Sequence, residues 1–91
     1  MADVFVTLKI MPESPETDLE KIKVKASELI ANFEGKVHKS EEKPVAFGLK
    51  ALEIMFIMNE AKGSTEKLET QISEMDDVVS VDVIDVRRAI G

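Results

Sequence analysis

Several residue types are missing or scarce in this chain of 91 residues, and each absence excludes a class of chemistry. The sequence contains no cysteine, which excludes disulfides, thiolate metal sites, iron–sulfur clusters and cysteine nucleophiles. It also contains no tryptophan or tyrosine, and His38 is its single histidine. His38 lies in a polar stretch, where we expect an exposed side chain. From these residues we predict no catalytic group, no metal site and no cofactor.

Basic residues are fewer than acidic ones, and long apolar runs are absent from the sequence. Eighteen acidic residues outnumber 12 basic ones, which gives a net charge of −6 at pH 7. Because nucleic-acid affinity depends on neutralising phosphates, we expect no direct nucleic-acid partner. No apolar run approaches the length of a membrane-spanning helix, and no basic segment followed by an apolar one opens the chain. We therefore expect a cytoplasmic protein with no membrane contact.

Apolar residues make up 44% of the chain, which is enough for the core of a single domain over residues 1–91. Four segments have the alternation or the composition of strands: 4–11, 36–43, 49–58 and 79–83. The first and third are the most apolar and are predicted as central strands, whereas the lysines and glutamates of the second are typical of an edge. In the fourth, every second residue from Val79 to Val83 is valine, and the phase then slips at Ile84-Asp85, which predicts a bulge.

Two helices are predicted between the strands. Thr17 and Glu20 have the spacing of a capping box, and the apolar stripe that follows stops near Gly35. This stripe consists of Leu19, Ile22, Ala26, Leu29, Ile30 and Phe33. Ser64 is the expected N-cap of a second, shorter helix. Its stripe consists of Leu68, Ile72 and Met75.

The order of these elements, strand–helix–strand twice over, predicts the fold. Two βαβ halves with right-handed crossovers give a ferredoxin-like βαββαβ plait of the α+β class. Its four-stranded antiparallel sheet would have the order 4-1-3-2, with two helices on one face. The other face would carry Glu53 among apolar residues and is expected to be only partly covered. Because this fold hosts many functions, the function must be argued from particular residues.

Two features are not explained by the fold alone. Phe47 lies in the segment Pro44-Val-Ala-Phe-Gly48, where an aromatic residue could point outward or could fill the core at a bent strand start. Arg87 and Arg88 lie near the end of an acidic chain, either as solvated tail charges or as functional cations. Neither feature by itself indicates a function.

Four stretches of the sequence, taken together, resemble a known family. They are Lys9-Ile-Met-Pro-Glu-Ser-Pro15, Thr17-Asp18-Leu19, Pro44-Val-Ala-Phe-Gly-Leu49 and Asp85-Val-Arg-Arg88. Through them the whole chain resembles the archaeal translation elongation factor 1-beta family, which is similar to the C-terminal exchange domain of its eukaryotic counterparts. The resemblance implies a guanine-nucleotide exchange factor, without covalent chemistry, that promotes GDP release from the GTPase elongation factor 1-alpha during polypeptide elongation. We expect it to be monomeric.

The same resemblance implies which residues meet the GTPase. In the eukaryotic relatives, an aromatic residue in the loop that matches Phe47 reaches into the GTPase near its switch region. A lysine just before the C-terminus approaches the Mg²⁺ and phosphate site, and Arg88 falls at that position with a forked guanidinium in place of the ammonium. We predict that ring and guanidinium act as a wedge. The implied partner-binding residues are Pro44, Ala46, Phe47, Gly48, Arg87 and Arg88.

Three other functions compete with nucleotide exchange. A small-ligand-binding regulatory domain of the same fold would act as a dimer through the sheet face that carries Phe5, Met55 and Ile57. An enzyme of the small acyl-phosphate hydrolase type needs an anion-binding first loop with an arginine, and residues 12–16 supply neither. An RNA-binding plait is disfavoured by the net charge and by an aromatic content of 4%. The regulatory dimer stays open as the alternative.

Overall fold

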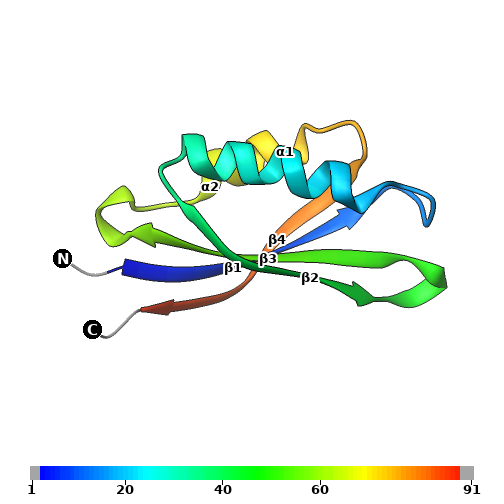
Figure 1. Ribbon diagram of the computed structural model, residues 1–91, viewed down its shortest axis with the longest axis horizontal. Coiled ribbons are helices and arrows are strands. Elements are labelled where there is room, and N and C mark those ends of the chain that lie inside the picture. The colour runs from blue at the N-terminus through cyan, green and yellow to red at the C-terminus, as the bar shows by residue number, and fades with distance from the viewer. Residues whose placement is uncertain (1–2, 89–91) are drawn as a thin grey trace.

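The strands and helices follow one another in the predicted order. A computed structural model describes residues 3–88 of the chain. Its elements are β1 (Asp3–Pro12), α1 (Leu19–Asn32), β2 (Lys36–Pro44), β3 (Lys50–Asn59), α2 (Glu66–Ser73) and β4 (Val78–Arg88). Two short 3₁₀ turns, η1 (Ala46–Gly48) and η2 (Glu60–Lys62), flank β3. The sheet order is β2-β3-β1-β4 with every neighbouring pair antiparallel, which confirms the predicted plait (Figure 1).

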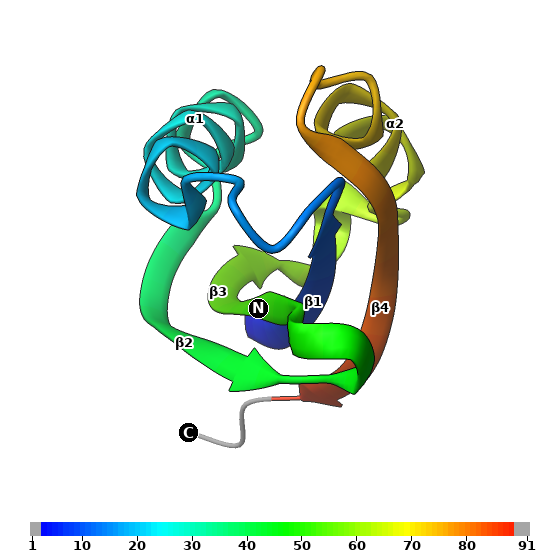
Figure 2. The same ribbon diagram turned by 90° about the vertical axis from the view of Figure 1, so that its right-hand side faces the viewer.

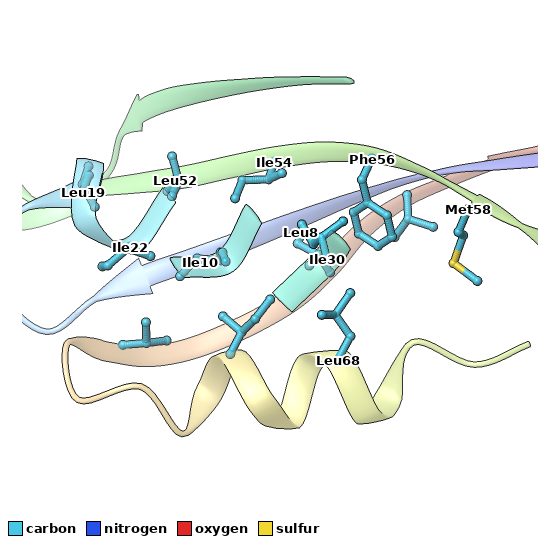
Figure 3. Packing of buried hydrophobic residues seen from close by; sticks show 14 residues of the cluster. Leu8, Ile10, Leu19, Ile22, Ile30, Leu52, Ile54, Phe56, Met58 and Leu68 are labelled. Atoms are coloured by element: carbon cyan, nitrogen blue, oxygen red, sulfur yellow. The ribbon is translucent and has the colours of Figure 1, made fainter. Parts of the chain in front are cut away.

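Both helices cover the same face of the sheet, and the core lies between the two layers (Figure 2). The apolar stripe predicted on β3 faces this core and is buried: Leu52, Ile54, Phe56 and Met58. Figure 3 shows the labelled side chains of both layers turned into this space. Because strand side chains alternate between faces, the two-residue period of the sequence decided which side of β3 would be buried.

The opposite face of the sheet is partly covered, as predicted. Glu53, Met55 and Ile57 of β3 are half-buried there. The ring of His38 meets the ring of Phe5 edge-on, with centroids 5.6 Å apart. His38 itself is exposed, as its polar surroundings indicate. The aromatic pair therefore occupies part of the face that a regulatory dimer would use.

The first helix begins one residue later than the predicted capping box requires. Asp18 is the N-cap of α1, and its carboxylate accepts a hydrogen bond from the Glu20 N–H at 3.0 Å. The prediction of a Thr17 cap is wrong because Thr17 Oγ1 accepts from the Ser14 N–H instead, at 3.2 Å. The hydroxyl is therefore used in the turn before the helix, and the next residue supplies the cap.

The start of α2 shows the same shift. Thr65 is its N-cap in place of the predicted Ser64, because the Thr65 carbonyl accepts the helical hydrogen bond from the Glu69 N–H at 2.9 Å. Ser64 Oγ still accepts from the Glu66 N–H at 3.0 Å. The predicted hydroxyl thus satisfies a free N–H from just outside the helix.

Gly35 follows α1 for a steric reason. Glu34, with φ of 68°, takes the left-handed position, and its N–H donates to the Ala31 carbonyl at 3.0 Å. The Gly35 N–H donates to the Ile30 carbonyl at 2.8 Å, which completes a Schellman motif. A Cβ at Gly35 would lie 2.9 Å from Ile30 Cγ2 and 3.1 Å from Phe56 Cδ2. The glycine is needed because the turn packs directly on the core.

Gly35→Ala is expected to lower the free energy of unfolding by about 1–3 kcal/mol, because the added methyl group meets two fully buried side chains. Thermal denaturation measures this as a drop in Tm of at least about 4 °C for a domain of this size. Ile30→Leu removes the clashing Cγ2, so Gly35→Ala should cost less in that background. An unchanged Tm for Gly35→Ala would contradict the steric explanation.

Strand β4 carries two register shifts against β1, of which one is predicted. Ile84 is the extra residue of the first, as the phase slip in the sequence indicates. The second shift, at Val79, is a correction to the predicted alternation: Val79 is 64% exposed, and Val78 is the buried residue. Because both residues are valine, the sequence pattern does not distinguish which of them packs.

Candidate functional site

The turn between β2 and β3 presents Phe47 to solvent. Phe47 is 94% exposed, the largest value among the large apolar residues that the structure describes. Pro44, Ala46 and Gly48, which the resemblance assigns to the same contact, are exposed around it. The interpretation of Phe47 as a core residue is therefore wrong, and the outward interpretation is confirmed.

The backbone holds Phe47 in an unusual conformation. Phe47, with φ of 60° and ψ of 32°, and Gly48, with φ of 74°, both lie in the left-handed region. The Leu49 N–H donates to the Ala46 carbonyl at 3.3 Å, so these two residues are the centre of a turn with positive φ at both positions, as in type I′. Such positions favour Asn, Asp and Gly, and a bulky residue is strained there. Strain of this kind is found at functional sites.

A hollow of about 310 Å³ adjoins the tip and reaches the turn that leads into α1. Its lining includes one ammonium group and three carboxylates: Lys50, Asp18, Glu20 and Glu42. Nearby on β2, Lys43 Nζ lies 3.1 Å from Glu41 Oε2. This hydrogen bond, together with the charge of Lys39, holds the pKa of the Glu41 carboxyl below its usual range. The surface around the tip therefore carries charges of both signs, with lysine and carboxylate side chains interspersed.

Arg87 and Arg88 are the last residues of β4 and project from opposite faces of the sheet. Arg87 lies on the open face, opposite Phe5 in the register, and its Nε is 2.9 Å from Asp85 Oδ2. Arg88 lies on the helix side, and its Nη2 donates to the Glu60 carboxylate. The two arginines are therefore strand residues with acidic partners rather than free charges of a tail.

The turn that carries Phe47 and the end of β4 that carries the two arginines lie at opposite ends of the sheet (Figure 1). Val4 of β1 pairs with Met58 on one side and with Arg88 on the other, whereas Lys50 adjoins the turn that carries Phe47. The stretch of β3 between Lys50 and Met58 spans about 26 Å at roughly 3.3 Å per residue. The whole molecule is 41 Å long. The two candidate features are therefore separate from each other and do not form one compact wedge.

The turn η2 lies at the end of the sheet that carries Arg87 and Arg88, and the sequence pattern does not predict its contacts. Glu60 binds Arg88, while Lys62 pairs with Glu34 at the end of α1. Lys62 Nζ also lies 5.9 Å from the centroid of the Phe33 ring. The hydrogen bond and charge of Lys62 hold the pKa of the Glu34 carboxyl below its usual range. Glu60 and Arg88 are 28 positions apart, so no local spacing could reveal their contact.

The rest of the described chain offers little chemistry. Over residues 3–88, no group of three His, Asp or Glu side chains is arranged to hold a metal ion. Neither helix in that part of the chain has the length and hydropathy to cross a bilayer. A wider hollow of about 600 Å³ lies between α1 and α2, but its lining contains none of the predicted site residues. The two ends of the sheet remain the candidate site.

Comparison with known proteins identifies the family of this chain. The family model for the EF-1 guanine nucleotide exchange domain matches residues 5–89. The chain is 47% identical over 88 residues to elongation factor 1-beta of Methanobrevibacter smithii, which covers 97% of this chain and 98% of that protein. It is 46% identical over 89 residues to elongation factor 1-beta of Methanothermobacter thermautotrophicus, with the same coverage of both chains.

A solved structure supports the fold independently of the family. The ACT domain from the GTP pyrophosphokinase of Chlorobium tepidum superposes with a TM-score of 0.61 over 90% of this chain and 99% of that one. The two sequences are 14% identical, so the likeness concerns the fold alone. The family match and the archaeal relatives, in contrast, indicate a guanine nucleotide exchange role in translation elongation. The chain belongs to the EF-1 guanine nucleotide exchange domain family.

Proposed function

We propose that residues 1–91 act as one monomeric unit that promotes GDP release from the GTPase elongation factor 1-alpha. The observation that carries the proposal is the 94% exposure of Phe47 in a turn whose backbone disfavours a bulky residue. A large aromatic ring gains nothing for folding in that place. It is suited to fill a pocket on a partner protein.

Exchange requires that the factor and GDP oppose each other on the GTPase. By linkage, a factor that weakens GDP binding by a given number of fold is itself weakened equally by GDP. Each tenfold weakening of GDP binding requires about 1.4 kcal/mol of unfavourable coupling free energy between the factor and GDP. The protein must therefore bring contacts that fit the nucleotide-free GTPase better than the GDP complex.

Phe47 would supply the first of these contacts. Full burial of the ring in a GTPase pocket would contribute about 1.5–3 kcal/mol. The turn around it is closed by the Leu49–Ala46 hydrogen bond and by the Val45 N–H, which donates to the Leu49 carbonyl at 2.8 Å. Because these bonds order the backbone before binding, less conformational entropy is lost in the complex.

Arg88 would supply the second contact. Its guanidinium would bring positive charge toward the Mg²⁺ ion of the GTPase, and two unit charges about 4 Å apart repel by roughly 4 kcal/mol at an effective dielectric near 20. A weakened ion would release the phosphates of GDP. Arg87 projects from the other face of the sheet, so a single GTPase surface on the helix side would meet Arg88 alone.

The separation of the two contacts sets the size of the interface. The turn with Phe47 and the end of β4 with Arg88 lie at opposite ends of the sheet (Figure 1), and the molecule is 41 Å long. If both touch the same GTPase, its footprint must run along the whole sheet. Such a footprint fits an interface of ordinary size for a specific protein complex, about 800 Å² on each partner.

The experiment that tests the proposal is the release of fluorescent GDP from the cognate elongation factor 1-alpha. The rate of release is expected to rise with the concentration of this protein and to reach a plateau. No acceleration at any concentration would contradict the proposal. The alternative, a small-ligand-binding regulatory domain, predicts instead a dimer in sedimentation analysis and a Tm that shifts with a metabolite.

A further inference from the structure

Glu60 forms an ion pair with Arg88, the residue that the proposed function places near the Mg²⁺ ion of the GTPase. Arg88 Nη2 donates to Glu60 Oε1, and the two side chains are 67% and 43% exposed. Asn59, just before Glu60, pairs with Asp3, and Arg88 pairs with Val4. The ion pair therefore crosses the end of β1 and joins η2 to the last residue of β4.

Glu60 is the better-fixed member of the pair. Asn59 Oδ1 accepts from the Ala61 N–H at 2.8 Å and so closes the turn that carries Glu60. On the other side of the turn, Lys62 pairs with Glu34, which follows the C-terminal end of α1. Arg88, in contrast, extends a long and mostly exposed side chain from an edge strand. When a partner surface approaches, the arginine side chain is the group that can move.

The pair also cancels the charge that the mechanism needs. A guanidinium beside a carboxylate presents no net charge to an approaching ion, so its repulsion of Mg²⁺ is offset by the attraction from Glu60. Arg88 can act on the ion only after it leaves this carboxylate. Exposed ion pairs are weak, so the separation is readily reversible.

We propose that Glu60 is a positioning residue that keeps Arg88 against η2 in the free protein and releases it when the GTPase binds. This inference rests on the proposed function, in which Arg88 acts at the ion. Partner binding then includes an additional step, in which the Arg88 guanidinium leaves the Glu60 carboxylate and turns to the GTPase. The ion pair thus lowers the kcat/KM with which the factor promotes GDP release.

Glu60→Gln is the direct test, because it keeps the size of the side chain and removes its charge. At low ionic strength it is expected to raise kcat/KM for GDP release by about 1.5- to 5-fold, the range that an exposed ion pair allows. The gain should appear mainly in KM, should shrink at high salt, and should vanish when Arg88 is already alanine. The matched control is Glu74→Gln, an exposed acid at the end of α2 with the same change in net charge.

The outcomes separate this inference from the proposed function. If Arg88→Ala slows release but Glu60→Gln behaves like Glu74→Gln, the positioning role is wrong and the proposed function stands. If Glu60→Gln slows release, the carboxylate orients Arg88 in the complex, and the inference is overturned. If Arg88→Ala has no effect, the role of Arg88 in the proposed function fails together with the inference. A gain that depends on Arg88 supports both.

Discussion

Phe47→Ala is expected to slow the stimulated release of GDP by roughly 10- to 100-fold, which corresponds to the loss of about 1.5–3 kcal/mol of ring burial in the complex. The fold should be unaffected because Phe47 is 94% exposed and contributes little to the core. Stopped-flow release of fluorescent GDP measures the first effect, and thermal denaturation measures the second. Full stimulation of GDP release by the alanine variant would show that Phe47 is not part of the interface.

Phe47→Asn makes the same test independent of folding. Asparagine tolerates the left-handed conformation that residue 47 adopts, so this variant is expected to be at least as stable as the wild type and to lose stimulation equally. Val24→Ala is the matched control, since Val24 is also an exposed apolar residue, at 54%, but lies on α1. It should leave the rate of stimulated release unchanged. A stable but inactive asparagine variant would separate binding from folding at a single position.

Arg88→Ala is expected to slow stimulated release about tenfold or more in the presence of Mg²⁺. The estimate follows from the roughly 4 kcal/mol by which two unit charges about 4 Å apart repel at an effective dielectric near 20, of which only part need be realised. In EDTA the wild type and the variant should agree within about twofold, because the ion on which the guanidinium acts is gone. An equally large defect without Mg²⁺ would show that Arg88 contributes binding energy and does not act on the ion.

Arg87→Ala is the matched comparison for this experiment. The two arginines are neighbours in the sequence but project from opposite faces of β4, with Arg87 beside Asp85 and Arg88 beside Glu60. If charge at the end of the strand were all that mattered, both variants would lose activity equally. We expect the loss to be clearly larger for Arg88→Ala, because a single partner surface meets one face of the sheet.

The fold could be predicted from the sequence because its elements repeat at the right periods. The alternation in β1 and β3 and the stripe on α1 fixed the buried faces before any tertiary contact was known. The predicted details that were wrong lie where two neighbouring residues can fill the same structural role. Val78 and Val79 are both valine, and Thr17 and Asp18 can both cap a helix, so the choice between them depends on neighbours that the sequence does not place.

The candidate site shows the same division. The segment around Phe47 and the arginine pair could be found by their resemblance to a family, and the exposure of Phe47 could be suspected from the flanking proline and glycine. The partners of the arginines could not be found in this way. Glu60 lies 28 positions from Arg88, and only the pairing of β1 with both β3 and β4 brings them together.

By itself, the sequence determined the order of the elements, the composition of the core and the absence of thiol chemistry, because these depend on local periodicity and on residue type. The tertiary structure alone decided two further properties. It placed Phe47 and Arg88 at opposite ends of the sheet and set a carboxylate beside Arg88. The physical reason is that strand pairing joins residues that are remote in the chain, and no local pattern records which of them will meet.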